Sequence, residues 1–168
     1  MPVAVLGLVV SLAMIGWLWR HPGVFEPSPE LAWGYGHQPV DRVLYFGLSA
    51  PANTRDGEQV TVNQLAPRVT TNTSGATFSF FACTLAPTAT GPVAAVRDVN
   101  VPCAEVRRLD PGATFETGPD RQLVMSVQPT RPGRVELSGV SLDYGQGWQR
   151  GSAWFGTRVA IESVRPRR

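Results

Sequence analysis

A chain of 168 residues, 43% of them hydrophobic, is long enough for one domain with a buried core and too short for a large multidomain enzyme. Its 17 glycines and 15 prolines argue against a helical bundle. All 15 basic residues are arginine, and against 13 acidic residues they leave a net charge of only +2. That charge is too small to indicate a nucleic-acid partner, and we expect none. The arginine bias, with abundant Ala, Pro, Gly and Val, indicates a GC-rich bacterial genome.

The N-terminal segment is the most apolar part of the chain. Residues 2–19 contain no charged side chain and would span about 27 Å as a helix, close to the hydrocarbon thickness of a bilayer. Trp17, Trp19 and Arg20 follow the pattern of a membrane interface, in which amphipathic rings lie beside a cation. The sequence therefore predicts a transmembrane helix over residues 1–19, an uncleaved signal anchor that contacts lipid through residues 2–19. A cleaved signal peptide is the alternative, but the segment has no basic n-region and no small-x-small cleavage site.

Two features of the sequence disagree on the side of the membrane that the domain occupies. The flanking Arg20 follows the apolar segment, and the positive-inside rule alone would place the domain in the cytoplasm. Two cysteines in a β-rich domain favour an oxidising compartment instead. We therefore expect a single-pass protein of the cell membrane with an extracytoplasmic domain.

Residues 20–39 form a Pro-rich stalk or arm with no sustained periodicity. Four of its residues are apolar enough to pack against the membrane or the domain, namely Phe25, Leu31, Trp33 and Tyr35. An ordered arm that covers a sheet edge is therefore favoured over a disordered stalk.

From residue 40 to residue 163 the chain predicts an all-β fold. Short segments rich in β-branched and aromatic residues are separated by Gly, Pro, Asn and Asp clusters. They give seven or eight strands, the number and size of an immunoglobulin-like β-sandwich, preceded by the one N-terminal transmembrane helix. The predicted strands cover residues 40–48, 60–65, 76–85, 93–101, 113–116, 121–128, 135–144 and 154–161, and residues 164–168 form a basic tail.

Three local signals refine this prediction. Val135 and Leu137 share one parity while Val140 and Leu142 share the other, so the register must switch near Gly139, a candidate β-bulge. Residues 109–112 carry the Pro-Gly pattern of a type II turn. Residues 144–148 read as a hairpin turn.

The two cysteines, Cys83 and Cys103, are expected to form a disulfide in an oxidising compartment. Closing a loop of that length contributes about 3 kcal/mol in the chain-entropy model. Two buried thiols are the alternative if the domain is cytoplasmic. A redox-active pair is disfavoured because the CxxC spacing is missing.

No catalytic, cofactor or metal site is predicted. His21 lies at the predicted membrane surface and His37 in the Pro-rich segment, so neither imidazole lies on a predicted core element. The acidic residues of the loops show no calcium-loop spacing, and two distant histidines with two cysteines match no zinc pattern. We interpret the protein as a non-enzyme.

One aromatic group is a candidate binding patch. Tyr144, Trp148, Trp154 and Phe155 surround the Gly-rich hairpin, where exposed rings could stack on sugars or enter a partner's pocket. The alternative, which is the commoner case, is that these residues fill one end of a sandwich core.

The segment 109–161 (LDPGATF, then RQLVMSVQPTRPGRVELSGVSLDYGQGWQRGSAWFGTRVAI) resembles the C-terminal part of small membrane-anchored β-sandwich proteins of GC-rich Gram-positive bacteria. The resemblance implies a cellular setting and assigns no activity and no functional residues. We expect a non-catalytic membrane protein whose domain is an interaction or accessory module of a cell-envelope complex, with a membrane or envelope protein as partner. The alternative is a module that binds cell-wall polysaccharide through Trp148 and Trp154.

Overall fold

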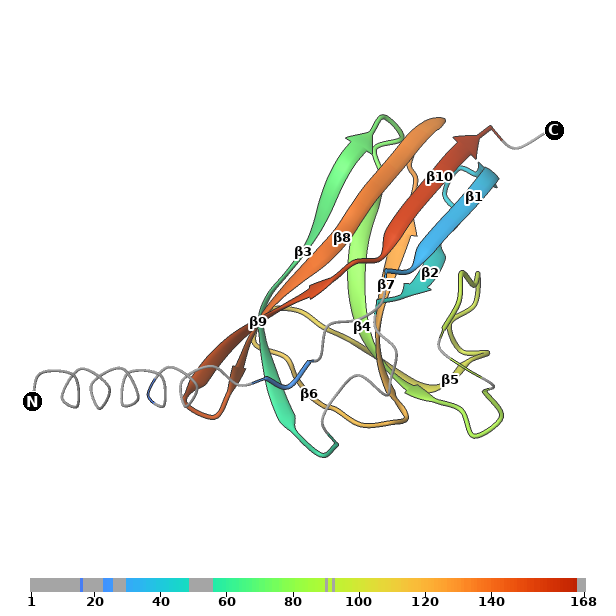
Figure 1. The fold of residues 1–168 in the computed structure, drawn as a ribbon. Helices are drawn as coiled ribbons and strands as arrows, with labels where there is room; N and C mark the ends of the chain where they lie inside the picture. Colours follow the sequence, from blue (N-terminus) through green and yellow to red (C-terminus); the bar gives the residue numbers. More distant parts are fainter. Residues whose placement is uncertain are drawn as a thin grey trace, which may run out of the picture.

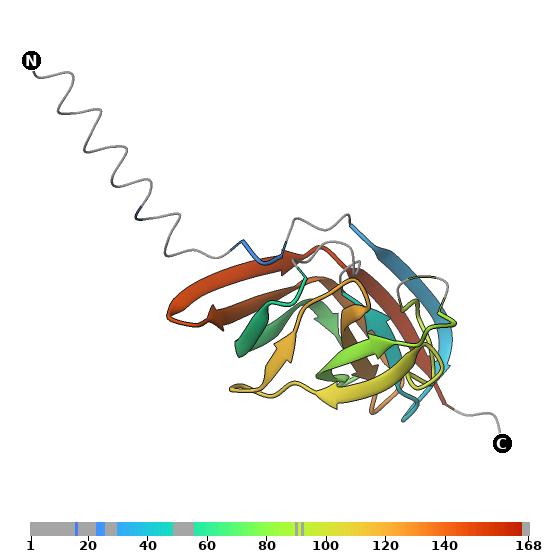
Figure 2. The same ribbon diagram turned by 90° about the horizontal axis from the view of Figure 1, so that it is seen from below.

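Two β-sheets packed face to face form the domain in the computed structural model, which describes residues 16, 23–25, 30–48, 56–89, 91 and 93–165 (Figures 1 and 2). The larger sheet has the strand order β1-β10-β8-β3-β6, with β9 also paired to β8, and the smaller sheet has the order β2-β7-β4-β5. We call these sheet 1 and sheet 2. The strands are β1 (Ala32–Pro39), β2 (Leu44–Gly47), β3 (Gln59–Asn72), β4 (Thr77–Leu85), β5 (Cys103–Arg108), β6 (Thr114–Glu116), β7 (Arg121–Gln128), β8 (Gly133–Gln146), β9 (Gln149–Phe155) and β10 (Arg158–Val164).

The strand order is that of an immunoglobulin-like sandwich. In chain order, β2, β3, β4, β7, β8 and β10 correspond to strands B to G of that fold. The neighbours β2-β7-β4 then reproduce the order B-E-D, and β3-β8-β10 the order C-F-G. The first strand, β1, pairs in parallel with β10, whereas the other strand pairs are antiparallel. The predicted all-β fold is thus confirmed, with ten strands in the described part of the chain where seven or eight were expected.

The predicted transmembrane helix lies outside the described residues except for Gly16, as do the interface residues Trp17, Trp19 and Arg20. Among the residues that the structure describes, no helix is both long and apolar enough to cross a bilayer.

Strand β7 is buried on both faces because sheet 2 is covered from two sides. Leu123, Met125 and Val127 point into the core between the sheets, as their alternation predicts. Val124, on the opposite face, belongs to a second apolar cluster that contains both cysteines. The covering layer is the chain between β4 and β5, where Val93 is buried against the outer face of the sheet.

Residues 93–101 do not form the predicted strand. The segment is irregular and touches the sheet through one isolated bridge, between Val96 and Tyr45. The side chain of Asp98 accepts a hydrogen bond from the backbone N–H of Asn100 at 3.0 Å, and this local bond favours a turn over a strand. Of the valines in this segment, Val93 and Val99 are buried against sheet 2, whereas Val101 is 75% exposed.

Strand boundaries differ from the prediction in further places, among them β3, which extends to Asn72 although the predicted strand ended at Leu65. The strand predicted over residues 40–48 is limited to β2, the return predicted over 154–161 is divided into β9 and β10, and β5 was not expected. The type II turn is confirmed, because the Ala113 N–H donates to the Asp110 carbonyl at 2.9 Å and Gly112 has φ +89°.

The predicted register switch in β8 is confirmed at Gly139. In a regular strand Leu137 and Val140 would point to opposite faces, because they are three positions apart, yet both are buried. The pairing with β3 shifts between them. Gly139 itself has φ +154°. A Cβ atom there would lie 2.6 Å from Cη2 of Trp154 and 2.7 Å from the Phe155 carbonyl oxygen. The bulge therefore requires glycine for both its conformation and its close contact with the indole.

We predict that Gly139→Ala lowers the free energy of unfolding by about 2–4 kcal/mol, because it adds backbone strain and a steric clash. Gly112→Ala is the matched control: its φ is also positive, but no atom lies within 4 Å of the added Cβ, so it should cost only about 1 kcal/mol. Urea unfolding of both variants, alone and with Trp154→Ala, measures the two contributions. Equal losses for Gly139→Ala with and without Trp154 would show that the indole contact is unimportant.

Candidate functional site

The segment that follows the apolar N-terminus is built into the core of the sandwich. Val24 has no exposed surface, and its backbone N–H donates to the Tyr144 hydroxyl at 3.4 Å. The Phe25 ring meets Tyr144 edge-on at 5.1 Å and Phe155 at 5.7 Å between ring centroids, and it also packs near Phe115 at 6.2 Å. The chain is therefore fixed to β6, β8 and β9 immediately after the predicted membrane interface.

Sequence reasoning identified Phe25 as able to pack but did not place it in the core. The available signal was an apolar pair, Val24 and Phe25, isolated between glycine and prolines. The second half of the predicted stalk or arm is strand β1, which extends sheet 1 beside β10.

The predicted aromatic patch is divided between the core and the surface. Tyr144 and Phe155 are each 1% exposed and fill the core, whereas Trp148 is 67% and Trp154 47% exposed. Trp148 lies in the β8–β9 turn, and Trp154 is six residues further along, near the end of β9. At about 3.4 Å per residue, the two tryptophans are about 20 Å apart along the strand. They do not form one binding patch.

Trp154 borders a shallow hollow of about 640 Å³ on the outer face of sheet 1. The hollow crosses β1, β10, β8 and β3, and its polar lining is mixed in charge. Glu30 and Arg158 form an ion pair at 2.9 Å, and Glu136 accepts a hydrogen bond from Thr71 at 3.1 Å. Its lining includes Glu30, Trp33, Arg68, Glu136, Trp154 and Arg158.

A second cavity, of about 250 Å³, opens beside Phe25 between the edges of the two sheets. Its arginines are held by neighbours, because Arg107 donates to the Thr114 carbonyl and Arg121 to the Thr84 hydroxyl. Two glutamates in the same wall, Glu105 and Glu116, balance their charge. The cavity therefore has no preference for an anionic ligand.

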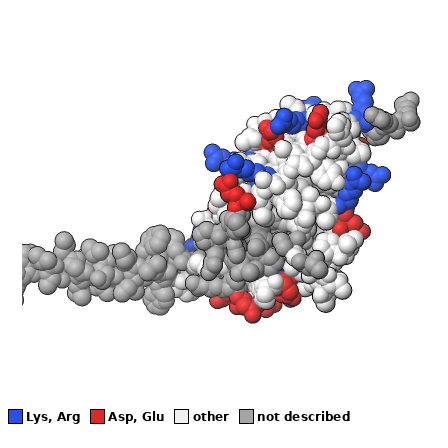
Figure 3. Space-filling view, turned by 45° about the vertical axis from the view of Figure 1, so that its right-hand side comes forward, with Lys and Arg blue, Asp and Glu red and all other residues white. Residues whose placement is uncertain are grey.

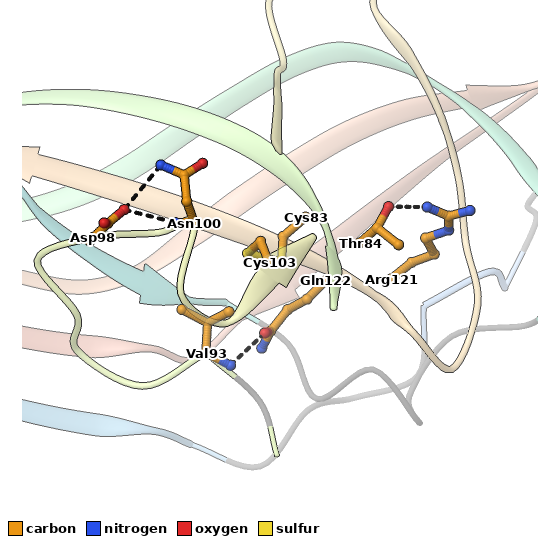
Figure 4. The surroundings of a disulfide bond; sticks show 8 residues. All are labelled: Cys83, Thr84, Val93, Asp98, Asn100, Cys103, Arg121 and Gln122. Atoms are coloured by element: carbon orange, nitrogen blue, oxygen red, sulfur yellow. Dashed lines mark hydrogen bonds between the residues drawn. A yellow bond between two sulfur atoms is a disulfide. The ribbon is translucent and has the colours of Figure 1, made fainter. Parts of the chain in front are cut away.

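The expected disulfide between Cys83 and Cys103 is present and joins β4 to β5 within sheet 2 (Figure 4). Both cysteines are buried, at 1% and 3% exposure. Beside them the Val93 N–H donates to Oε1 of the buried Gln122 at 2.6 Å. The disulfide and this hydrogen bond together hold the covering layer on the outer face of sheet 2.

Candidate catalytic groups are not brought together in the described part of the chain. His37 is exposed in β1, with φ +58°, and His21 lies outside the described residues. Within those residues no group of three or more His, Cys, Asp or Glu side chains could hold a metal ion. On the face drawn in Figure 3, basic and acidic side chains lie together over the upper part of the domain, and the described groups along its lower edge are acidic.

Comparison with known proteins leaves the family open. No family model matches the chain, and no curated protein matches it. Among solved structures, a match is the human ASH/PapD-like domain of CEP192, PapD-like domain 7, at 7% sequence identity and a TM-score of 0.37, covering 87% of this chain and 90% of that one.

Proposed function

We propose that the chain is a non-catalytic, single-pass membrane protein whose immunoglobulin-like domain lies directly on the extracytoplasmic face of the membrane as an interaction or accessory module of an envelope complex. One observation carries this proposal. The apolar segment 2–19 is followed almost immediately by Val24 and Phe25, which are part of the core of the domain.

The spacing leaves no room for a stalk. Val24 follows Trp19 by five residues, and a fully extended chain of five residues is at most about 18 Å long. A domain on a flexible tether would have a linker of polar residues between the anchor and the first core residue. Here the end of the sandwich that holds Val24 lies within that short distance of the bilayer, which suits a module that contacts other membrane-bound proteins.

The disulfide supports the extracytoplasmic side. Disulfides persist in secreted and surface-exposed proteins and are rare in the bacterial cytoplasm. The Cys83–Cys103 bond holds a buried layer of sheet 2, so the domain depends on a compartment in which that bond stays oxidised.

Membrane fractionation with thiol trapping tests the proposal. We expect the full chain to remain in carbonate-washed membranes, and both cysteines to react with maleimide only after denaturation and reduction. A variant that begins at residue 23 should be released into the soluble fraction, because it lacks the apolar segment. Recovery of the full chain in the soluble fraction, or acid-trapped cysteines that are fully reduced, would contradict the proposal.

A second candidate function, binding of a cell-wall polysaccharide, is favoured by the half-exposed indole of Trp154. The ring lies against Gly139 at the border of the hollow on sheet 1, where hydroxyl, carboxylate and guanidinium groups are also available to hydrogen-bond a sugar. Apolar sugar faces stack on such rings.

We predict that, if this second function operates, Trp154→Ala weakens binding to isolated wall polymer about tenfold, the loss expected for about 1.4 kcal/mol of stacking. Trp148→Ala is the matched control, since it removes an exposed tryptophan from the same strand pair without touching the hollow, and its binding should be unchanged. Co-sedimentation with purified polymer measures both. Equal binding by Trp154→Ala and the wild-type chain would exclude this function.

A further inference from the structure

The tip of the β8–β9 hairpin presents an exposed tryptophan on a rigid support. Gln146 pairs with Gln149, so the turn consists of the two residues Gly147 and Trp148. Gly147 has φ +57°, as the first central residue of a type II′ turn requires. With 67% of its surface exposed, Trp148 is the most exposed tryptophan that the structure describes.

The hairpin is packed closely around Tyr144, the residue that also binds Val24. Tyr144 is buried in β8 opposite Gly151 of β9, where a Cβ atom would lie 2.7 Å from the tyrosine hydroxyl oxygen. The same hydroxyl accepts the hydrogen bond from the Val24 N–H. Figures 1 and 2 show the hairpin and residues 23–25 on the same side of the domain.

The distances bring this tip within reach of the bilayer. Trp148 is four residues beyond Tyr144, or about 14 Å along the strand. Val24, bonded to Tyr144, is at most about 18 Å of chain from Trp19, where the predicted transmembrane segment ends. These two lengths are similar, so the hairpin tip reaches the headgroup region when the hairpin points toward the membrane.

We propose that the hairpin tip is a second membrane contact, in which Trp148 enters the interfacial layer of the bilayer that holds the N-terminal segment. The ligand is the lipid surface, because tryptophan favours the headgroup level, where its ring is partly in hydrocarbon and its N–H remains hydrated. This inference rests on the proposed membrane anchor. With two contacts, one covalent and one through the hairpin, the tilt of the domain on the membrane is fixed.

Trp154 is the natural control because it also points outward from β9, yet lies about 20 Å further from the tip and against Gly139. The full chain is reconstituted into phosphatidylcholine–phosphatidylglycerol vesicles with an environment-sensitive fluorophore on Arg150→Cys, an exposed position two residues from Trp148. The native cysteines do not react, because they form the disulfide. Quenching of the fluorophore is then measured with a nitroxide on the lipid near the headgroup and, separately, with a water-soluble quencher. The two values report whether the probe faces the bilayer or the water.

We expect the lipid nitroxide to quench the probe, and the quenching to fall several-fold in Trp148→Ala but not in Trp154→Ala. Vesicle flotation, measured on the same samples, separates the two proposals. If the chain floats with the vesicles but only the aqueous quencher reaches the probe, or Trp148→Ala leaves the quenching unchanged, the hairpin contact is wrong and the anchor stands. If the chain does not float, the anchor and the hairpin contact are both wrong.

Discussion

The packing of Val24 and Phe25 against Tyr144 is the contact on which the arrangement of this protein depends. Burial of a phenylalanine ring contributes about 1.5–3 kcal/mol, and here the ring closes an aromatic cluster shared by β6, β8 and β9. In the sequence these residues follow the apolar N-terminus closely, so only a short stretch of chain separates the core of the domain from its proposed anchor. Under the proposed function, this packing limits how far the domain can lie from the membrane.

The two sheets differ in what they leave available to a partner. The outer face of sheet 2 is covered by the layer between β4 and β5, which the disulfide and the Val93–Gln122 hydrogen bond hold in place. On the outer face of sheet 1, none of the residues that the structure describes forms such a layer over the hollow, where Trp154 is exposed beside several charged groups. Under the proposed function, this face of sheet 1 is the one that we propose for a partner protein, and under the second candidate function for a wall polymer.

Much of the fold could be predicted from the alternation of apolar residues along the sequence. Where the predicted strands were wrong, the reasons are physical. The parity switch at Gly139 was readable because both halves of β8 bury every second side chain. Strand β1 was not recognised as a strand because its Gly and Pro residues and mixed polarity hide the pairing that it makes at a sheet edge. The valines of residues 93–101 imitated a strand, but only Val93 and Val99 are buried, and they pack an irregular segment onto sheet 2.

The predicted aromatic patch shows why residues that are close in sequence need not share a surface. Sequence proximity grouped four aromatic residues around a hairpin, but strand parity separates them: Phe155 points into the core and its neighbour Trp154 to solvent. Applying the period-two rule through Trp154 would have shown this separation. The contact of Val24 with Tyr144 joins residues 120 positions apart, and no local pattern encodes it.

The central claim, that Val24 and Phe25 are part of the domain core, is tested most directly by the stability of Phe25→Ala. Urea unfolding of the full chain in detergent should show a loss of about 2–3 kcal/mol with an unchanged dependence on urea concentration, because a half-buried ring is removed from an aromatic cluster. Val101→Ala, at a position that is 75% exposed, should change the stability by less than about 0.5 kcal/mol. Equal stabilities of Phe25→Ala and the wild-type chain would show that the segment does not belong to the core.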